Sequence, residues 1–373
     1  MKLTVTTLAS CVAALLALGM VMLYSATMTQ EGAKYPVAQL LWCTMGLVAA
    51  AVAARSDYRL LANVAVPLYL VAVVLLALVL VIGKTAYGAT RWLDLGVRFQ
   101  PSEFAKLALI VVLAWYGARY ARHMPAFWRG MMVPGAMIGV VMALVFLEPD
   151  VGTTILIGAV GCVILVVAGI RWKYLLPPAL VVAAGIGLFI WQNPTRSDRI
   201  YSWLHLEETR RGTGMQVYEA ILAFGAGGWD GLGLGNSRQK LGFIPFHQTD
   251  FILPVVGEEL GVIASLGVIT AFALIVICGV RIASHARDEF GMLMAAGISF
   301  LIGLQAFVNM AVVTNVLPNK GLPLPFISRG GSNLFVMLVC VGLLFSIARQ
   351  ARAPEAKPAN PFARDEFPSP QPT

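Results

Sequence analysis

Acidic side chains stand where polar stretches of this chain meet long apolar runs, and these boundaries are the places best suited to chemistry. Asp250 directly precedes an apolar run, and Glu258 follows it eight residues later, so a helix would place both on one face. Carboxylates at such a boundary are costly unless they are paired or used. A helix N-cap explains Asp250 taken alone equally well, but its acidic companion favours a functional acid.

Basic side chains stand in a second unusual stretch, residues 317–332, whose three prolines and three glycines exclude a simple helix. The stretch is nevertheless largely apolar. Irregular backbone at membrane depth is tolerated only where it is buried in protein or lines a wet cavity. Lys320 and Arg329 would be cations at that cavity, and Ser332 ends the stretch. We therefore expect an anionic substrate to bind there.

Glu103 and Lys106 form a third candidate pair. They are three residues apart, on a helix that Pro101 and Ser102 are well suited to open. That spacing allows them to form an ion pair. The pair either fixes helix packing or takes part directly in substrate binding, and the sequence leaves both readings open.

Two more carboxylates, Glu148 and Asp150, flank Pro149 in a tight connection without a basic residue. Proline ends the preceding helix, and Asp150 can cap the next one. A turn explains this motif. Carboxylates this close could also hold a divalent cation, Mg²⁺ or Mn²⁺, beside a pyrophosphate, and that is the one cofactor the chemistry leaves open.

Other motifs exclude several kinds of site. The glycine-rich run 225–236 matches neither a dinucleotide fingerprint nor a P-loop, so it is a flexible loop that either moves over substrate or only connects elements. The five cysteines all lie within apolar runs, and the four histidines are scattered. We therefore predict no disulfide framework and no metal-ligand motif.

The elements that position these residues follow from composition. The chain is 58% hydrophobic and 12% charged, with mean hydropathy +0.78, whereas soluble domains carry about 25% charged residues. Continuous apolar runs of about 18 residues or more predict an all-α polytopic membrane protein rather than a barrel. About ten transmembrane helices are expected, near residues 6–28, 36–54, 60–82, 103–120, 130–147, 151–170, 174–192, 251–279, 291–316 and 331–348.

One long polar stretch, residues 193–250, separates helices seven and eight and retains Trp203, Trp229, Phe243 and Phe246. We expect it to fold against the membrane surface. The distribution of Lys and Arg favours an exterior position for this loop and a cytoplasmic position for both termini. The excess of Lys and Arg on the cytoplasmic side is clear only when the residues of the long loop are left out of the count. The predicted domain is 1–350, followed by a disordered tail, 351–373. Topology explains the net charge of +8, so we expect no nucleic-acid partner.

Several long motifs in order resemble the SEDS family, which comprises the FtsW, RodA and SpoVE proteins. The resemblance spans roughly residues 6–350. Residues 320–322 and 235–237 resemble its cell-division branch, FtsW, more than its elongation branch, RodA. In one departure, Arg329 stands where the family often has tyrosine. The motifs that carry the resemblance are residues 91–96, 100–106, 148–153, 225–240, 249–261 and 320–332.

The resemblance implies ten helices, cytoplasmic termini and a large exterior loop between helices seven and eight. It also implies a peptidoglycan glycosyltransferase that polymerises lipid II in the bacterial inner membrane, at the division septum. The implied partners are a class B penicillin-binding protein and other division proteins. The family's essential acid matches Asp250.

Roles for the candidate residues follow from that reaction. Asp250 would be the general base, and Lys320, with Arg329 or an arginine of the long loop, would stabilise the pyrophosphate. Glu103 and Lys106 would hold the cavity. The residues expected to bind substrate are Lys320, Arg329, Glu258, Glu103, Lys106, Arg91 and Ser332.

Two rival functions fit the same helices. A lipid II flippase would need the wet cavity but no acid at the exterior boundary. A non-catalytic scaffold for a penicillin-binding protein would tolerate Asp250→Asn. An elongation polymerase of the RodA type is the alternative branch.

Overall fold

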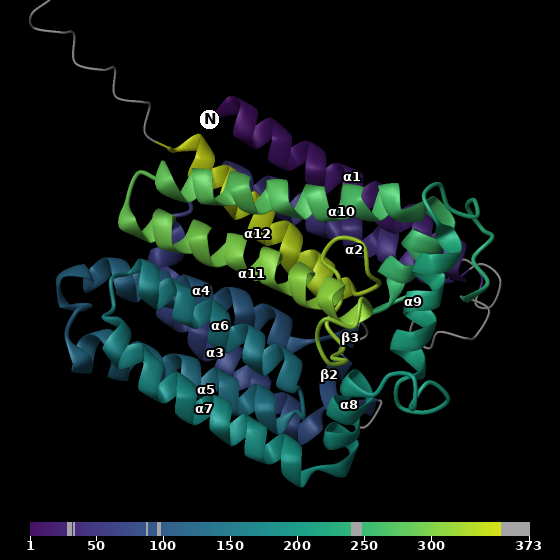
Figure 1. The fold of residues 1–373 in the computed structure, drawn as a ribbon. Coiled ribbons are helices and arrows are strands. Elements are labelled where there is room, and N and C mark those ends of the chain that lie inside the picture. The colour runs from purple at the N-terminus through teal and green to yellow at the C-terminus, as the bar shows by residue number, and fades with distance from the viewer. Residues whose placement is uncertain (28–31, 33, 87–88, 95–97, 240–247, 352–373) are drawn as a thin grey trace, which may run out of the picture.

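The computed structural model describes the chain apart from residues 28–31, 33, 87–88, 95–97, 240–247 and 352–373. Phe243, Phe246 and all of the predicted tail except Ala351 lie outside the described residues. Figure 1 shows a bundle of long helices that run along one common direction.

Nine helical segments of the described chain are long and apolar enough to cross a membrane. A tenth apolar helix, α6, is shorter. This confirms the predicted all-α polytopic architecture, and the ten segments match the expected ranges closely. They are α1 (Lys2–Thr27), α2 (Lys34–Arg55), α3 (Leu60–Ile82), α4 (Pro101–Arg119), α5 (Val133–Leu147) extended by a π-helical turn at Trp128–Met132, α6 (Val151–Val167), α7 (Trp172–Gln192), α10 (Ile252–Ser284), α11 (Glu289–Val313) and α12 (Gly331–Arg349).

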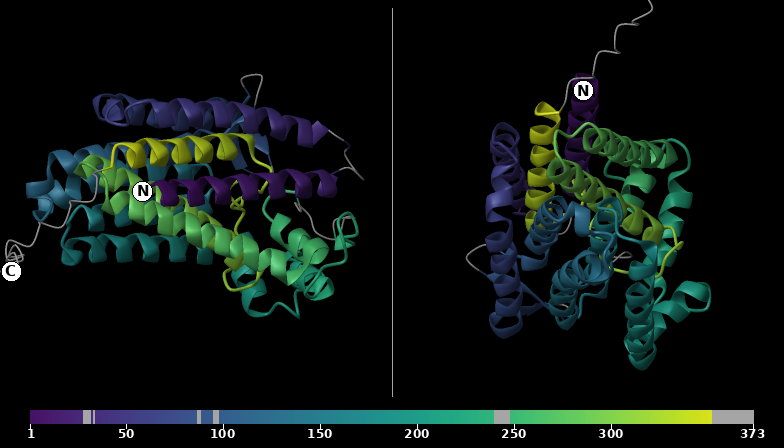
Figure 2. Two further views of the ribbon diagram at one scale, coloured as in Figure 1. Left: turned by 90° about the horizontal axis from the view of Figure 1, so that it is seen from above. Right: turned by 90° about the vertical axis from the view of Figure 1, so that its left-hand side faces the viewer.

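The long loop contributes two helices, α8 (Pro194–Leu204) and α9 (Met215–Gly227). The connection from α3 to α4 forms a small antiparallel sheet that composition alone did not predict. Its strands, in spatial order, are β1 (Lys84–Ala86), β2 (Ala89–Asp94) and β3 (Arg98–Phe99). Helices α8 and α9 and strands β2 and β3 gather at one end of the bundle, opposite the N-terminus (Figures 1 and 2).

Helix α4 lies at the centre of the bundle and α7 at its edge. In α4, 83% of the membrane-length window is buried, against 6% in α7. The difference follows from sequence, because α4 carries ionisable side chains that must face protein, whereas α7 is apolar on all sides and suits contact with lipid. The candidate residues of α4 are therefore held in the interior.

Helices α2 and α12 pack closely through small residues. A Cβ added at Gly342 would lie 2.4 Å from the carbonyl oxygen of Ala50 and 2.7 Å from its Cα. Small residues allow the two backbones to approach this closely. In a bilayer, close packing drives helix association, because lipid tails are as apolar as the side chains and no hydrophobic driving force acts between helices. The contact positions α12, whose first turn carries Ser332.

The glycine-rich run packs against a kink in α10 at Gly261, where φ is 78°. The amide of Leu232 donates to the carbonyl of Glu258 at 2.9 Å, and that of Gly233 to the carbonyl of Glu259 at 3.0 Å. A Cβ at Gly231, which also has positive φ, would lie 2.3 Å from the Glu259 carbonyl oxygen. The glycines thus allow backbone-to-backbone contact, and this part of the run is anchored.

We expect Gly342→Ala to destabilise the protein by about 1–3 kcal/mol, because the new methyl group overpacks backbone that cannot move aside. The matched control is Gly267→Ala in α10, where an added Cβ meets no atom within 4 Å. Alanine favours a helix over glycine by up to about 1 kcal/mol, so the control should be neutral or stabilised. Thermal unfolding of the detergent-purified variants measures both, and equal midpoints would contradict the close packing.

Candidate active site

Asp250 lies in a turn, residues 248–250, that leads into α10 at the end of the bundle where the loops gather. The backbone of this turn is fixed by two neighbours. Asn309 of α11 donates from Nδ2 to the Asp250 carbonyl oxygen at 2.8 Å. Ser328 donates from Oγ to the Thr249 carbonyl oxygen at 2.6 Å. These contacts fix the position of Asp250 through its backbone.

The side chain of Asp250 does not cap α10, since the N-cap residue is Phe251 and has no side-chain cap bond. Gly321 lies against the Asp250 carboxylate, where an added Cβ would be 2.7 Å from Oδ2. Burial, and next the negative charge of Asp150, raise the pKa of Asp250 to about 7, against the opposing charge of Arg91. A carboxyl with a pKa near neutrality is suited to accept a proton.

Arg91, on β2, binds the turn that connects α5 to α6. Its Nη2 donates to the Pro149 carbonyl oxygen at 3.0 Å, and its Nε lies 3.6 Å from Oδ2 of Asp150. Asp150 caps α6 by accepting from the Thr153 amide at 3.0 Å. The predicted turn and cap are confirmed. The charges of Arg91 and Asp150 both act on Asp250, so β2, this turn and the start of α10 meet at one site.

Glu148 begins the same turn and is fully buried, at 0% exposure. Neither of its carboxyl oxygens has a hydrogen-bond partner within the described part of the chain. Burial, and next the charge of Asp150, raise the pKa of Glu148 to about 8. A buried polar group without a partner is unusual enough to require an explanation.

Arg196, in the first turn of α8, brings further positive charge to this end of the bundle. Its guanidinium lies over the ring of Phe189, 4.3 Å from the centroid. Burial chiefly lowers the pKa of Arg196, with the charges of Arg199 and Arg91 adding to the effect. Its buried Nη1 has no hydrogen-bond partner among the described residues. Arginines that repel one another in this way are suited to bind an anion.

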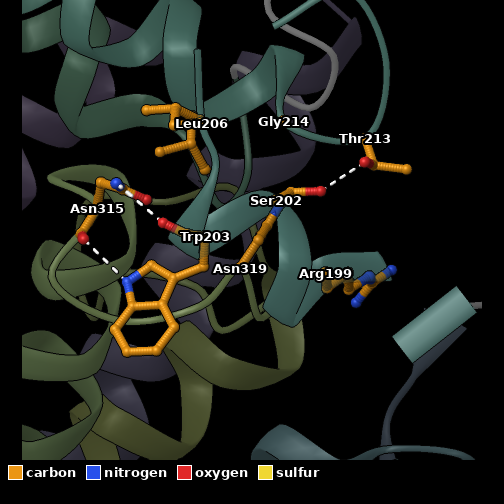
Figure 3. Close-up of a pocket in the computed structure, with 9 residues that line it drawn as sticks. Arg199, Ser202, Trp203, Leu206, Thr213, Gly214, Asn315 and Asn319 are labelled. Atoms are coloured by element: carbon orange, nitrogen blue, oxygen red, sulfur yellow. Dashed lines mark hydrogen bonds between the residues drawn. The ribbon is translucent and has the colours of Figure 1, made fainter. Parts of the chain in front are cut away.

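A pair of hydrogen bonds holds α8 in place (Figure 3). The indole Nε1 of Trp203 donates to the Asn315 carbonyl oxygen at 3.0 Å, and Asn315 Nδ2 donates to the Trp203 carbonyl oxygen at 3.5 Å. A shallow surface depression, lined among others by Arg199 and Asn319, lies beside them. This part of the exterior loop is folded onto the bundle, and it joins α8 to the segment that carries Lys320.

Lys320 and Arg329, the two predicted cations, have different surroundings. Lys320 is half-buried and directly precedes Gly321, which lies against Asp250. Burial lowers the pKa of Lys320. The Arg329 guanidinium instead lies over the ring of Tyr35 in α2, 3.2 Å from the centroid. Lys320 is therefore the sequence neighbour of the residue that lies against the candidate acid, while Arg329 is engaged in a cation–π contact.

Glu103 and Lys106 form a buried ion pair with a separation of 2.7 Å. Glu103 also accepts from Asn333 of α12 at 2.7 Å, and Lys106 donates to Gln305 of α11 at 2.9 Å. Gln305 in turn donates to the Pro323 carbonyl oxygen at 2.9 Å. This geometry supports the packing interpretation, because the pair connects three helices to the loop beside Asp250. Direct binding of substrate by the pair stays a prediction.

Glu258 and Ser332 also make structural contacts. The buried Glu258 accepts from the Arg238 amide at 2.9 Å and from the Ser237 hydroxyl. Ser332 accepts from the Gln100 amide at 3.1 Å. Both residues thus attach loops to helices near the site, and their predicted contact with substrate stays untested.

The sequence did not single out Arg196. Its only signal was a basic residue at the start of a proline-led segment in the long loop, which also holds other arginines. Lys320 and Arg91 were found because they belong to recognisable motifs. Among the described residues, no three His, Cys, Asp or Glu side chains form a group that could hold a metal ion.

We expect Lys106→Met to destabilise the protein by about 3–5 kcal/mol, because it leaves Glu103 as a buried charge without its partner. The double variant Glu103→Met/Lys106→Met should recover part of that loss, since no charge remains. Thermal unfolding of both variants beside the wild type measures the difference. A single variant as stable as the wild type would contradict the structural role of the pair.

The fold and site define a polytopic membrane protein whose acidic and basic side chains converge at one end of its helical bundle. The model of the family described as "Cell cycle protein", comprising FtsW, RodA and SpoVE, matches residues 6–353. This chain belongs to that family, the SEDS proteins.

Relatives named probable peptidoglycan glycosyltransferase FtsW are similar over nearly the whole chain. That of Trichlorobacter lovleyi is 39% identical over 346 residues, covering 90% of this chain and 91% of the relative. That of Coxiella burnetii is 37% identical over 352 residues, covering 91% and 94%. These similarities agree with the predicted division branch.

Solved structures show the same fold. A chain from a peptidoglycan synthase complex, studied for coordination of polymerization and crosslinking, has a TM-score of 0.78 and 29% identity. It covers 92% of this chain and 96% of its own length. RodA of Thermus thermophilus has a TM-score of 0.69 and 28% identity, covering 93% and 97%.

Proposed function

We propose that this protein is a peptidoglycan glycosyltransferase that polymerises lipid II into glycan strands at the exterior face of the inner membrane. The observation that carries the proposal is the carboxylate of Asp250, which does not cap its helix and has a pKa near 7. The relatives' names support the same activity.

The chemistry joins a sugar hydroxyl of one lipid-linked unit to the anomeric carbon of another. Asp250 accepts the hydroxyl proton as the new carbon–oxygen bond forms. The bond from the anomeric carbon to the pyrophosphate breaks, and its electron pair leaves with the lipid pyrophosphate. Negative charge on that leaving group is stabilised by cations held in place beforehand, for which Lys320 and Arg196 are the candidates.

Arg91 has a supporting part in this mechanism. Its side chain holds the 148–150 turn through the Pro149 carbonyl. Its charge opposes the upward pKa shift of Asp250, so Arg91 helps to keep the base ionised near neutral pH. Arg329 lies over the ring of Tyr35, and its predicted contact with the pyrophosphate stays untested.

A class B penicillin-binding protein and other division proteins are the proposed partners. Support comes from the similar chain in a peptidoglycan synthase complex. The proposed location is the inner membrane at the division septum, with both termini cytoplasmic and α8 and α9 outside. The excess of Lys and Arg in the segments thereby placed inside supports this orientation.

Two rivals remain distinguishable by experiment. A lipid II flippase would use the same membrane helices but needs no proton acceptor at the loop end of the bundle. A scaffold for the penicillin-binding protein would need only its outer surface. An acid with a near-neutral pKa on which the charge of Arg91 acts favours catalysis.

We expect Asp250→Asn to lower the rate of lipid II polymerisation by about 10²–10⁴-fold, because the amide cannot accept the proton. Purified full-length protein with its penicillin-binding partner would be assayed for glycan strands at equal folding and complex yield. Asp230→Asn is the matched control, because Asp230 is exposed on the same loop. Equal product from wild type and Asp250→Asn would remove Asp250 from the mechanism, and no product from wild type would favour the flippase or scaffold.

The maximal rate should depend on pH through Asp250. The base acts only when it is ionised, and its pKa is raised to about 7. The turnover number at saturating lipid II should therefore fall about tenfold per pH unit below pH 7 and level off above it. Folding of the protein at each pH is the control, and a rate that stays flat down to about pH 5 would contradict the assignment.

A further inference from the structure

The connections from α4 to α5 and from α6 to α7 lie at the end of the bundle opposite α8 and α9 (Figure 1). No step of the proposed reaction involves them. The sequence holds no acidic residue from 104 to 147 or from 151 to 197, so these connections have no acid of their own to balance their charge. Their five basic side chains are all exposed, and we call the surface that they form the basic face: Arg119, Arg122, Arg129, Arg171 and Lys173.

Side-chain contacts join the two connections into one surface. The ring of Phe127, before α5, meets the ring of Tyr174, in the first turn of α7, edge to face with 5.3 Å between their centroids. Tyr116 of α4 donates from its hydroxyl to the Arg129 carbonyl oxygen at 2.8 Å. The cations that precede α5 and those at the start of α7 therefore lie on the same side of the bundle and are held there by packing.

Basic side chains elsewhere at this end of the bundle have partners. Arg59 lies 2.8 Å from the Asp288 carboxylate, and Arg349 donates from Nη2 to the Arg55 carbonyl oxygen at 2.7 Å. Within the described part of the chain, no cation of the basic face forms an ion pair with an acid. Topology explains why Lys and Arg lie on this side of a membrane, but it does not require them to gather without acids on two adjoining connections.

Two large aromatic side chains border the basic face. Trp128 is 74% exposed and Trp172 is 68% exposed. Tryptophan is enriched at the level of lipid headgroups, because its ring is apolar and its N–H still finds a polar partner there. Indole rings that stand out beside a group of cations therefore indicate contact with the headgroup layer rather than with water alone.

The first turns of α7 offer an apolar surface directly beyond the cations. Only 6% of the membrane-length window of α7 is buried, and Leu176 and Leu180 are more than half exposed. They follow Lys173 by three and seven residues, so they lie on the same face of the helix. A lipid whose headgroup binds at Lys173 would place its acyl chains along that face.

We propose that the basic face binds the phosphate groups of an anionic phospholipid, of the phosphatidylglycerol or cardiolipin type, from the leaflet on this side of the bilayer. Clusters of Lys and Arg at the ends of membrane helices attract anionic lipids, and basic pockets between such helices bind their headgroups. A zwitterionic lipid carries its own balancing amine and gains less. The proposal is independent of the proposed activity, and it relies on the proposed orientation only to name this leaflet as the cytoplasmic one.

The test is lipid binding by the detergent-purified full-length protein, measured by native mass spectrometry during titration with phosphatidylglycerol, cardiolipin or phosphatidylcholine of matched acyl chains. Wild type should bind the two anionic lipids at least tenfold more tightly than phosphatidylcholine. The variant Arg122→Gln/Arg129→Gln/Lys173→Gln should lose most of that preference, because each Lys or Arg near an anionic surface is worth about fivefold in affinity.

The matched control is Lys2→Gln/Arg55→Gln/Arg281→Gln, which removes the same charge from exposed positions at the ends of α1, α2 and α10. It should keep the preference of the wild type. Equal affinity of the wild type for anionic and zwitterionic lipids would overturn the proposal. An equal loss in both triple variants would also overturn it, because general charge at this end of the bundle would then explain the binding.

A photoactivatable phosphatidylglycerol with a diazirine in its headgroup tests the wild type alone and so covers a triple variant that does not fold. Its crosslinks should fall mainly within residues 119–130 and 171–176, and crosslinks spread over both ends of the bundle would contradict the site. Displacement of the lipid by an equal concentration of inorganic phosphate would reveal a site for free phosphate instead. Glycan synthesis does not enter these readouts, so an inactive protein that keeps the lipid preference would count only against the proposed function.

Discussion

The buried ion pair between Glu103 and Lys106 is the interaction on which the site end of the bundle depends. A charge in a low-dielectric interior is tolerated only when it is paired and its remaining hydrogen-bonding capacity is met. Here that requirement involves Asn333 of α12 and Gln305 of α11, so α4 is tied to both helices. Because Gln305 also binds the Pro323 carbonyl, the same network fixes the proline-rich loop beside Asp250.

Buried polar groups that have hydrogen-bond partners support the fold, whereas buried polar groups without partners mark the candidate site. Glu258 accepts hydrogen bonds that attach the loop before α10, which gives it a supporting role in the fold. The carboxyl of Glu148 and one nitrogen of Arg196 are buried without a partner in the described chain. Asp250 is held by its backbone carbonyl, while its side chain does not cap the helix that follows. A bilayer interior penalises unmet polar groups strongly, so those that persist mark the places where substrate is expected.

Glycine permits the close approaches that bring distant segments to one site. Gly321 leaves room for the Asp250 carboxylate, and Gly231 lets the loop after α9 lie against the backbone of α10. Gly342 does the same between α12 and α2. In each case backbone or a functional group occupies the volume of the missing side chain. The end of the bundle is thus assembled from β2, the 148–150 turn, α8 and the loop after α11.

The sequence by itself determined the all-α membrane architecture, the ten apolar segments, the long loop between helices seven and eight, and Asp250 as the leading acid. These features follow from local rules. The length of an apolar run predicts a membrane-spanning helix, and an acidic residue where a polar loop meets an apolar run is easily recognised in the sequence. Only the tertiary structure decided that Arg196 and Arg91 lie close enough for their charges to interact and that Arg329 lies over Tyr35. It also decided that Glu148 has no hydrogen-bond partner among the described residues. Those outcomes depend on helices far apart in the chain, and residue spacing carries no information about such contacts.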